Sequence, residues 1–298
     1  MISIVTHAGA GSTRELDDLA RQAAEAGMAV LQGGGEALDA AVAAAAVLED
    51  DPRTNAGTGS ILRLDGETIE MDASVADSTG RMGAVAAIRA VKNPAQVARE
   101  VSKTPHVLLA GEGATAFARQ RGFPPYLNVT QRAKDRHADL VRKLRAVGRD
   151  GLRDIWKHAD LEAIWNLAKS WPEVSSACDT IGAAAVDARG VSAIATSTGG
   201  ASPMLLGRVG DSPLPGCGFY AGPAGAVGAT GIGEEIIRKT LAKTVYDWIQ
   251  AGLAPQTACE KGVALYPADV IIGLIAAAPA GLGAASNTGM AVCPLTRP

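Results

Sequence analysis

A run of small and apolar residues, Thr180–Asp187, narrows the possible folds of this chain more than any other segment. It is followed by a three-residue turn, Ala188-Arg189-Gly190, and by a second apolar run, Val191–Thr196, so the pair predicts a buried β-hairpin. Further strand patterns lie on both sides of Thr180, and helical patterns occur in pairs around them. This order favours a layered α/β structure in which helices cover packed sheets.

Apolar periodicity and turn residues place the remaining elements along the chain. Strands are expected at 2–6, 61–64, 68–71, 83–88, 106–109, 224–230, 270–278 and 284–292. Helices are expected at 16–31 and 36–48, from 93 onward, and at 112–120, 131–147, 152–169, 233–250 and 255–264. Charge rises and three tryptophans occur within about 123–179, which we interpret as a connector.

The composition is that of a globular chain with a large core. Hydrophobic residues make up 47% of it, and 35 glycines with only 4% aromatic residues suit closely packed layers. The net charge is −3 and the Lys and Arg residues are scattered, so no nucleic-acid partner is expected. No apolar run reaches the roughly 18 residues of a membrane span, and the N-terminus lacks the basic start of a signal peptide.

The cysteines show no spacing typical of a metal site. In a chain of this size without an export signal we interpret them as free thiols and expect a cytoplasmic protein. They are Cys178, Cys217, Cys259 and Cys293.

The Asp179-Thr180 pair stands where the connector meets the predicted central strand. A threonine at such a junction becomes a nucleophile if the peptide bond before it breaks, because the freed α-amine can act as its base. An Asp-Thr pair at a loop-to-strand boundary is also common without any catalytic role, so the pair needs support from the rest of the chain.

Two segments after Thr180 each have an ordinary and a functional interpretation. In TSTGG at 196–200, three hydroxyls end a strand; they form a solvated turn, or one of them reaches the Thr180 side chain. In GRVGD at 207–211, Arg208 and Asp211 form a surface ion pair, or they clamp the α-carboxylate and α-ammonium of an amino acid.

Other segments also have both an ordinary and a functional interpretation. ATGIGE at 229–234 is a tight turn or an oxyanion hole, because glycines expose N–H groups and Thr230 adds a donor. NAGTG at 55–59 is a turn or a rigid loop behind the nucleophile. GEGATA at 111–116 matches a dinucleotide-binding turn only superficially, because no second β unit with an acidic end follows. His7 is a general base or a structural hydrogen-bonding residue.

Seven motifs occur in order along nearly the whole chain, and their combination is far more specific than any one of them. They are HAGAG at 7–11, TNAG at 54–57, MDAS at 71–74, DTIG at 179–182, TSTGG at 196–200, GRVGDSP at 207–213 and ATGIGE at 229–234. With this set the chain resembles the Ntn-hydrolase family of plant-type L-asparaginases (isoaspartyl peptidases), glycosylasparaginases and threonine aspartases.

The resemblance implies a single domain, 1–298, with the four-layer αββα sandwich of Ntn hydrolases. It implies self-cleavage between Asp179 and Thr180 into an α subunit, 1–179, with a variable linker at about 123–179, and a β subunit, 180–298. The αβ units would pair as a homodimer. The implied activity is hydrolysis of L-asparagine and β-aspartyl (isoaspartyl) dipeptides to L-aspartate without a catalytic cofactor.

The family's functional residues fall on matching positions of these motifs. The implied catalytic residues are the nucleophile Thr180, its neighbours Thr198 and Asn55, and the oxyanion-hole residues Thr230 and Gly231. The implied substrate-binding residues are Arg208, Asp211, Gly231 and Gly233. The resemblance also implies a structural sodium ion on main-chain carbonyls, at positions Leu48, Glu49, Asp51, Thr54, Ala56 and Thr58.

The subfamily stays open at this point. Asp179 before the threonine is typical of glycosylasparaginases and threonine aspartases, whereas asparaginases usually have glycine there. Asp211 favours a substrate with a free α-ammonium, and the NAG loop at 55–57 favours asparaginase over glycosylasparaginase. Glycosylasparaginase is therefore the alternative activity. A chain that never cleaves and acts only as a binding protein is the second alternative.

Overall fold

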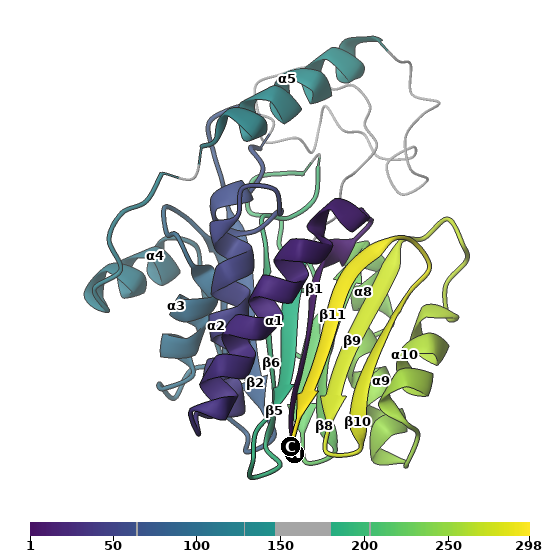
Figure 1. The fold of residues 1–298 in the computed structure, drawn as a ribbon. Coiled ribbons are helices and arrows are strands. Elements are labelled where there is room, and N and C mark those ends of the chain that lie inside the picture. The colour runs from purple at the N-terminus through teal and green to yellow at the C-terminus, as the bar shows by residue number, and fades with distance from the viewer. Residues whose placement is uncertain (64, 128, 147–179, 203) are drawn as a thin grey trace.

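The structure, a computed structural model, describes residues 1–63, 65–127, 129–146, 180–202 and 204–298 (Figure 1). Asp179, Cys178 and the helix expected at 152–169 lie outside the described residues. The described chain is a mixed α/β structure built on two β-sheets, so the predicted fold class is confirmed at that level.

The larger sheet has seven strands in the order β11-β1-β5-β6-β2-β3-β4. Its strand pairs are antiparallel except for β3 with β4. The predicted hairpin, β5 (Ile181–Val186) and β6 (Ser192–Thr198), lies in its centre between β1 and β2. The other strands are β1 Ile2–Ala10, β2 Met71–Asp77, β3 Met82–Ile88, β4 Leu108–Ala110 and β11 Met290–Arg297.

The smaller sheet lies against the larger one and has the order β10-β9-β8-β7. Its strands are β7 Phe219–Gly222, β8 Gly225–Gly231, β9 Ile272–Ala278 and β10 Gly281–Ser286. Apolar residues of both sheets, among them Val5, Ile194 and Ile275, form a buried cluster between them. The sheets approach closely: a Cβ added at Gly228 would lie only 2.7 Å from Ile194 Cδ1, which explains the use of small residues here.

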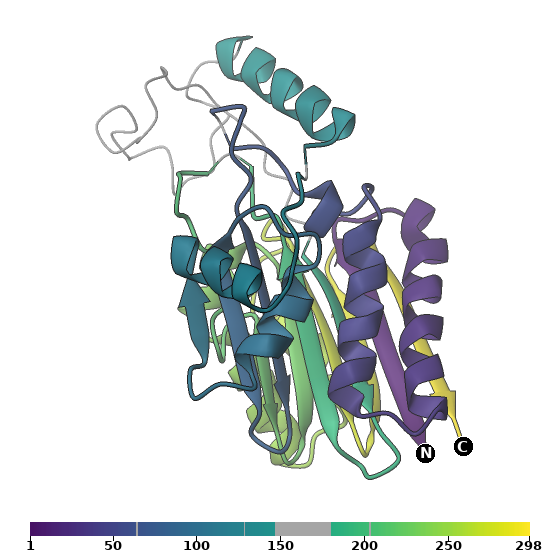
Figure 2. The same cartoon turned by 90° about the vertical axis from the view of Figure 1, so that its left-hand side faces the viewer.

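Helices cover the outer face of each sheet (Figures 1 and 2). On the larger sheet, α1 (Asp17–Gln32) packs on β1 and β11, α2 (Ala37–Asp50) on β5 and β6, and α3 (Pro94–Val101) on β2 and β3. On the smaller sheet, α9 packs on β7 and β8 and α10 on β9 and β10. The remaining bounds are α4 Gly111–Gln120, α5 Gln131–Ala146, α8 Gly233–Arg238, α9 Leu241–Gln250, α10 Pro255–Val263, and the short 3-10 helices η1 Arg14–Leu16 and η2 Gly57–Gly59.

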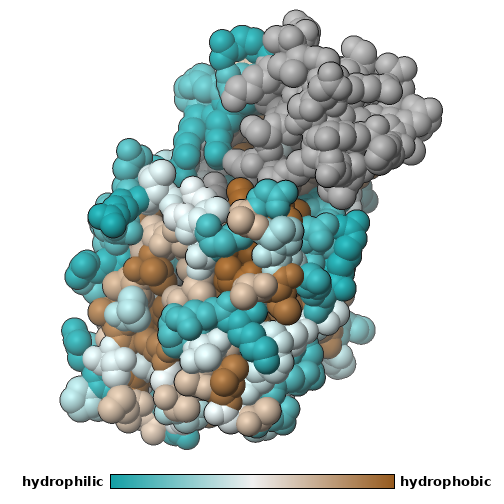
Figure 3. All heavy atoms as spheres, turned by 90° about the vertical axis from the view of Figure 1, so that its right-hand side faces the viewer, coloured by the Kyte–Doolittle hydropathy of each residue, from teal (hydrophilic) through white to brown (hydrophobic). Residues whose placement is uncertain are grey.

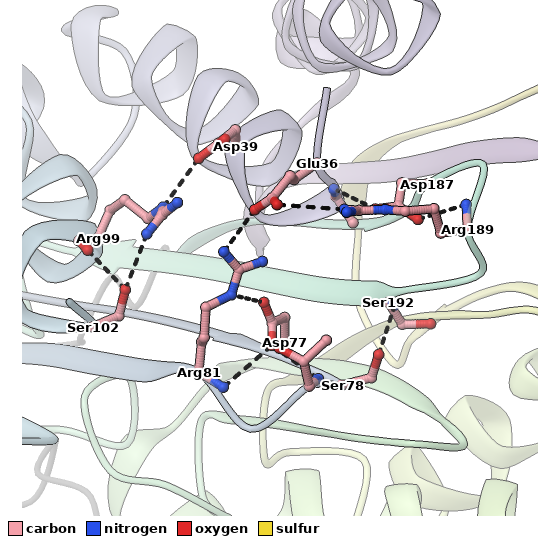
Figure 4. A network of polar contacts seen from close by, with 12 residues as sticks. Glu36, Asp39, Asp77, Ser78, Arg81, Arg99, Ser102, Asp187, Arg189 and Ser192 are labelled. Atoms are coloured by element: carbon pink, nitrogen blue, oxygen red, sulfur yellow. Dashed lines mark hydrogen bonds and ion pairs between the residues drawn. The ribbon is translucent and has the colours of Figure 1, made fainter. Parts of the chain in front are cut away.

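A charged network joins three turns at the end of β5 remote from Thr180 (Figure 4). Arg81 pairs with Asp77 and Glu36, and Arg189 pairs with Asp187 and Glu36. The network therefore links residues that precede the connector with residues that follow it.

On the face shown in Figure 3, hydrophobic patches lie among hydrophilic side chains. No helix in the described part of the chain is both long and apolar enough to cross a membrane. The three cysteines of the described ranges, Cys217, Cys259 and Cys293, are buried free thiols, as predicted.

The prediction of a single helix over 233–250 is wrong. It is divided into α8 and α9 at Thr240, whose φ of 42° lies in the left-handed region. The first turn of α9 is held from outside: the N–H groups of Ala242 and Lys243 donate to the carbonyls of Cys217 and Gly216, at 3.0 and 2.9 Å. Such remote contacts compensate the strained residue, and local periodicity cannot reveal them.

Three strand predictions also need correction. The strand predicted at 284–292 is divided into β10 and β11, because the Asn287 side chain fixes a turn: it accepts the N–H of Ile272 at 3.0 Å and donates to Val270 O at 2.7 Å. The described parts of 61–64 and 68–70 have no regular secondary structure; they flank a turn at 65–67, Arg63 N–H donates to Thr68 O at 2.8 Å, and β2 begins only at Met71. Strand β7 was not predicted.

Candidate active site

Thr180 immediately precedes the central strand β5 and is buried, with 4% of its surface exposed. Its hydroxyl Oγ1 lies 3.4 Å from the hydroxyl of Ser212. Its carbonyl oxygen accepts a hydrogen bond from the Thr230 hydroxyl at 3.2 Å. The predicted nucleophile is therefore held at the junction of the two sheets, with hydroxyl groups on both sides of it.

The register of β5 and β6 places Thr198, the predicted partner of the nucleophile, opposite Thr180. Ile181 pairs with Ser197, which places Thr180 opposite Thr198, and Thr198 pairs with Asp72 of β2. Thr198 Oγ1 accepts the N–H of Gly200 at 3.0 Å. A hydroxyl that accepts one hydrogen bond can still donate another, so Thr198 can donate a hydrogen bond to a neighbouring oxygen.

Asn55 supports the turn that follows Thr198. Its Nδ2 donates to the carbonyl of Gly200 at 2.7 Å, and its carbonyl accepts the N–H of Gly199 at 2.7 Å. Asn55 Oδ1 is buried and has no hydrogen-bond partner among the described residues. The predicted rigid loop behind the nucleophile is thus in contact with the end of β6.

One small pocket contains most of the predicted residues. It is lined by Thr180, Thr198, Gly200, Ala201, Arg208, Gly210, Asp211, Gly231 and Gly233. The prediction that residues of these separate motifs meet is supported by this lining, which does not include Thr230 and Asn55.

Arg208 and Asp211 lie on either side of Gly233. A Cβ added at Gly233 would be 2.8 Å from Arg208 Nη2 and 3.0 Å from Asp211 Oδ1, so only glycine leaves the space between the two charges open. Arg208 forms a two-bond ion pair with Glu234, from Nε at 2.9 Å and from Nη2 at 2.8 Å. The Arg208 side chain is only 15% exposed, whereas that of Glu234 is 36% exposed.

The Asp211 carboxylate is almost fully buried. Burial raises its pKa to about 7, against the opposing attraction of Arg208. Its Oδ2 atom has no hydrogen-bond partner among the described residues. A buried, unpartnered acceptor beside a pocket favours binding of a cationic group, because burial without a partner is costly.

Thr230 and Gly231 connect the nucleophile to the smaller sheet. The Thr230 hydroxyl accepts the N–H of Ala10 at 3.2 Å and donates to Thr180 O. Gly231 has a φ of 133°, and a Cβ added there would lie 2.1 Å from the carbonyl of Ile271. This backbone shape excludes other residues, and it exposes Gly231 to the pocket.

His7 is a structural residue in this arrangement. Its Nδ1 accepts the N–H of Gly9 at 3.1 Å, and full burial lowers its pKa to about 3, so the imidazole is neutral. Its ring packs on the central strand: a Cβ added at Gly182 would lie 2.5 Å from His7 Nε2. The structural interpretation of His7 is therefore favoured over the general base.

Several main-chain carbonyl groups lie close together in the loop after α2, and oxygen ligands of this kind suit a hard cation. The Thr54 hydroxyl lies 2.8 Å from Leu48 O and 3.1 Å from Asp51 O. The carbonyl of Glu49 lies close to the Cα of Gly57, and that of Thr54 lies close to the Cα of Gly59, so neither position has room for a side chain. No group of three or more His, Cys, Asp or Glu side chains within the described ranges could hold a metal ion. A cation here would depend on main-chain oxygens.

Three residues of the site were not singled out from the sequence: Ser212, Glu234 and Asp72. Ser212 and Glu234 belong to recognised motifs, but their contacts with Thr180 and Arg208 come from segments distant in the chain. Asp72 lies in the MDAS motif, where an acidic residue directly after a predicted strand was the available signal; the structure shows that it is buried within β2.

Comparison with known proteins agrees with the motifs. Residues 2–296 match the family model described as Asparaginase. The chain is 43% identical to the plant-type L-asparaginase of Pyrococcus furiosus over 89% of this chain and 85% of that protein. It is 40% identical to the plant-type L-asparaginase of Pyrococcus horikoshii over 97% and 94%, and 41% identical to the isoaspartyl peptidase/L-asparaginase of Danio rerio over 88% and 80%. The resemblance inferred from the motifs is confirmed, and the chain belongs to the asparaginase family.

Proposed function

We propose that this protein hydrolyses L-asparagine and β-aspartyl dipeptides and releases L-aspartate. The observation that carries the proposal is the pair of opposite charges, Arg208 and Asp211, in one small pocket with Thr180. The guanidinium suits an α-carboxylate, and the unpartnered Asp211 oxygen suits an α-ammonium. The names of the relatives in Pyrococcus and Danio point to the same substrates.

The active form requires a break before Thr180. In an intact chain the Thr180 nitrogen belongs to a peptide bond and cannot accept a proton, whereas a free α-amine has a reference pKa of about 7.7–8.0 and can. We propose self-cleavage at Asp179-Thr180 within a four-layer αββα Ntn-hydrolase fold. The helices outside both sheets and the three separate apolar clusters support this layering.

In the proposed reaction, the Thr180 α-amine takes the hydroxyl proton while Oγ1 attacks the β-carbonyl carbon of the substrate. Thr230 and the Gly231 N–H stabilise the oxyanion. The C–N bond then breaks, and ammonia or an amine leaves with the proton. Water then attacks the resulting ester and gives a proton to the α-amine; the bond between the acyl carbon and Oγ1 breaks, L-aspartate is released, and this second proton passes to Oγ1. Thr198 and Ser212 keep the hydroxyl oriented throughout.

A direct assay tests the function. Purified protein is incubated with L-asparagine, β-aspartyl-leucine and a glycosylasparagine, and the released aspartate is measured. We expect turnover of the first two. Faster turnover of the glycosylasparagine would favour the glycosylasparaginase alternative that Asp179 suggests, and no turnover of any substrate would favour a binding protein.

The pH dependence of substrate binding should follow Asp211. Its pKa is raised to about 7, so the carboxylate is neutral below that pH and anionic above it. Because only the anion attracts an ammonium group, KM for L-asparagine should rise as the pH falls through about 7. Asp211→Asn should have a high KM that hardly changes over this range. A pH-independent KM in the wild-type protein would contradict the assignment; kcat is measured separately because the α-amine titrates in the same direction.

We further propose that the carbonyl-rich loop at 48–58 binds a structural sodium ion. The expected result is a higher melting temperature in sodium chloride than in choline chloride at equal ionic strength, because a ligand bound only by the folded state stabilises it. Potassium chloride serves as the control for ion size. Identical melting temperatures in all three salts would exclude a sodium site.

The family resemblance also supports a homodimer of αβ units. Light scattering on the native protein tests this proposal: a mass equal to one chain would contradict it.

A further inference from the structure

One side of β2 holds the loop that carries both substrate anchors. Asp72 and Ser74 are two residues apart on β2, so their side chains point to the same side, and Glu70 immediately precedes the strand. Each of them bonds to the main chain of the loop 207–212. The contacts are Glu70 Oε2 with Gly207 N–H at 2.8 Å, Asp72 Oδ2 with Gly210 N–H at 3.3 Å, and Ser74 Oγ with Ser212 O at 2.6 Å.

These contacts matter because the loop has little stiffness of its own. Arg208 is bounded by Gly207, which has a φ of 76°, and by Gly210. Glycine is the most conformationally free residue, so a segment between two glycines needs external restraint to present a side chain in one place. The anchors at 207 and 210 lie on either side of Arg208, and the second of them directly precedes Asp211.

Asp72 is the central anchor, and its surroundings fit that role. Its carboxylate is fully buried, and the second oxygen, Oδ1, accepts the N–H of Ala87 on β3 at 2.8 Å. Burial raises its pKa, while the two N–H groups and the nearby guanidinium groups of Arg208 and Arg63 favour the anion. The register also places Asp72 beside Thr198 in the row that contains the nucleophile.

Glu70 and Ser74 restrain the two ends of the same loop. Glu70 is itself held by the buried Arg63, whose Nη1 donates to Gly199 O at the end of β6. The Ser212 carbonyl accepts a second bond, from Thr196 Oγ1 at 3.2 Å, so this end has two anchors. The loop is therefore attached to the same strands that align Thr180 and Thr198.

We infer that Asp72 is a positioning residue that sets the separation of Arg208 and Asp211, and with it the preference for substrates with a free α-carboxylate and α-ammonium. The inference rests on the proposed function. Asp72 touches neither substrate nor nucleophile; it acts through the main chain at Gly210 and through the charge of Arg208.

The test compares Asp72→Asn with Asp77→Asn. Asp77 is a matched control because it lies on the same strand, is equally buried and also accepts main-chain N–H groups, from Thr79 and Arg81 (Figure 4). Asp72→Asn keeps the shape but leaves one acceptor oxygen for two N–H groups; we expect it to stay with the shorter bond, from Ala87 at 2.8 Å, so that Gly210 N–H faces an amide N–H group. We expect KM for L-asparagine and β-aspartyl-leucine to rise about tenfold with kcat within about threefold of wild type, since misplaced anchors weaken binding.

Asp77→Asn should lower the melting temperature at least as much as Asp72→Asn and leave KM unchanged. Self-cleavage should proceed in both variants, because cleavage does not use the substrate anchors. An equal KM in wild type and Asp72→Asn, or an equal rise in both variants, would overturn the inference. Should Asp72→Asn fail to fold, Asp72→Ser decides: its shorter side chain cannot reach the Gly210 N–H, so a KM within twofold of wild type would overturn the inference.

The outcomes separate this inference from the function on which it rests. If the wild-type protein turns over neither substrate, both the proposed function and the positioning role of Asp72 are rejected. Wild-type turnover together with an unchanged KM in Asp72→Asn removes only the positioning role.

Discussion

Replacing Thr180 with alanine is expected to leave one intact chain and to reduce hydrolysis of L-asparagine by at least about 10³-fold, as removal of a nucleophile does in other hydrolases. The wild-type protein should yield two fragments, beginning at Met1 and Thr180, because the same hydroxyl serves cleavage and turnover. Mass spectrometry of the purified proteins and an aspartate assay measure the two effects.

Thr6→Ala is the matched control for this experiment. Thr6 is a buried threonine on the neighbouring strand β1, and its hydroxyl bonds to Ala20 O at 2.7 Å, away from the pocket. That variant should lose stability but still cleave and turn over substrate. Retained hydrolysis in Thr180→Ala would reject the nucleophile, and turnover by an uncleaved wild-type chain would reject the need for a free α-amine.

The cleaved fragments should stay together in native buffer. Strands β5 and β6 follow the proposed cleavage point, yet they lie between β1 and β2, which precede it. Separating the fragments would therefore break main-chain hydrogen bonds on both sides of the hairpin. Size-exclusion chromatography should show one native species, and denaturing electrophoresis should show two bands.

Replacing Arg208 with alanine is expected to raise KM for L-asparagine by about 100-fold with a smaller effect on kcat, within the range for charge-assisted hydrogen bonds. Two physical effects combine. The substrate carboxylate loses its partner, and Asp211 loses the cation that favours its ionised form. A series of KM measurements at increasing pH separates them, because the loss from Asp211 protonation shrinks as the pH rises whereas the loss of the carboxylate partner does not.

Two variants control the Arg208 experiment. Arg208→Lys keeps the charge without the planar fork, so an intermediate KM is expected. Arg189→Ala removes another ion-paired arginine, from the network remote from Thr180, and should leave KM unchanged (Figure 4). A KM for Arg208→Ala within twofold of wild type would exclude Arg208 as the carboxylate anchor.

Several parts of the molecule were predictable because their signals are local. The hairpin at 180–196 was predicted from two apolar runs joined by a short turn, and it forms β5 and β6. The helix pair α1 and α2 follows from amphipathic periodicity within single segments. The order of the seven motifs was enough to identify the family, because a combination of short patterns is specific even when each alone is not.

Other parts depended on contacts between distant segments. The break at Thr240 is held by carbonyls of residues 216 and 217, and the turn between β10 and β11 is held by Asn287 against β9. Strand β7 is only four residues long and is defined by its pairing with β8. No window along the chain contains this information, because hydrogen-bond partners supply it across the fold.

The active site shows the same division. Residue types and motif order along the chain were sufficient to nominate Thr180 as the nucleophile and Arg208 and Asp211 as anchors, since these roles depend on chemistry that a side chain carries wherever it lies. Only the tertiary structure shows that Ser212 contacts Thr180 and that Glu234 pairs with Arg208. It also shows that β2 restrains the loop 207–212. The reason is geometric. These contacts form only when the two sheets, the larger of which contains strands from before and after Thr180, bring remote residues within hydrogen-bonding distance.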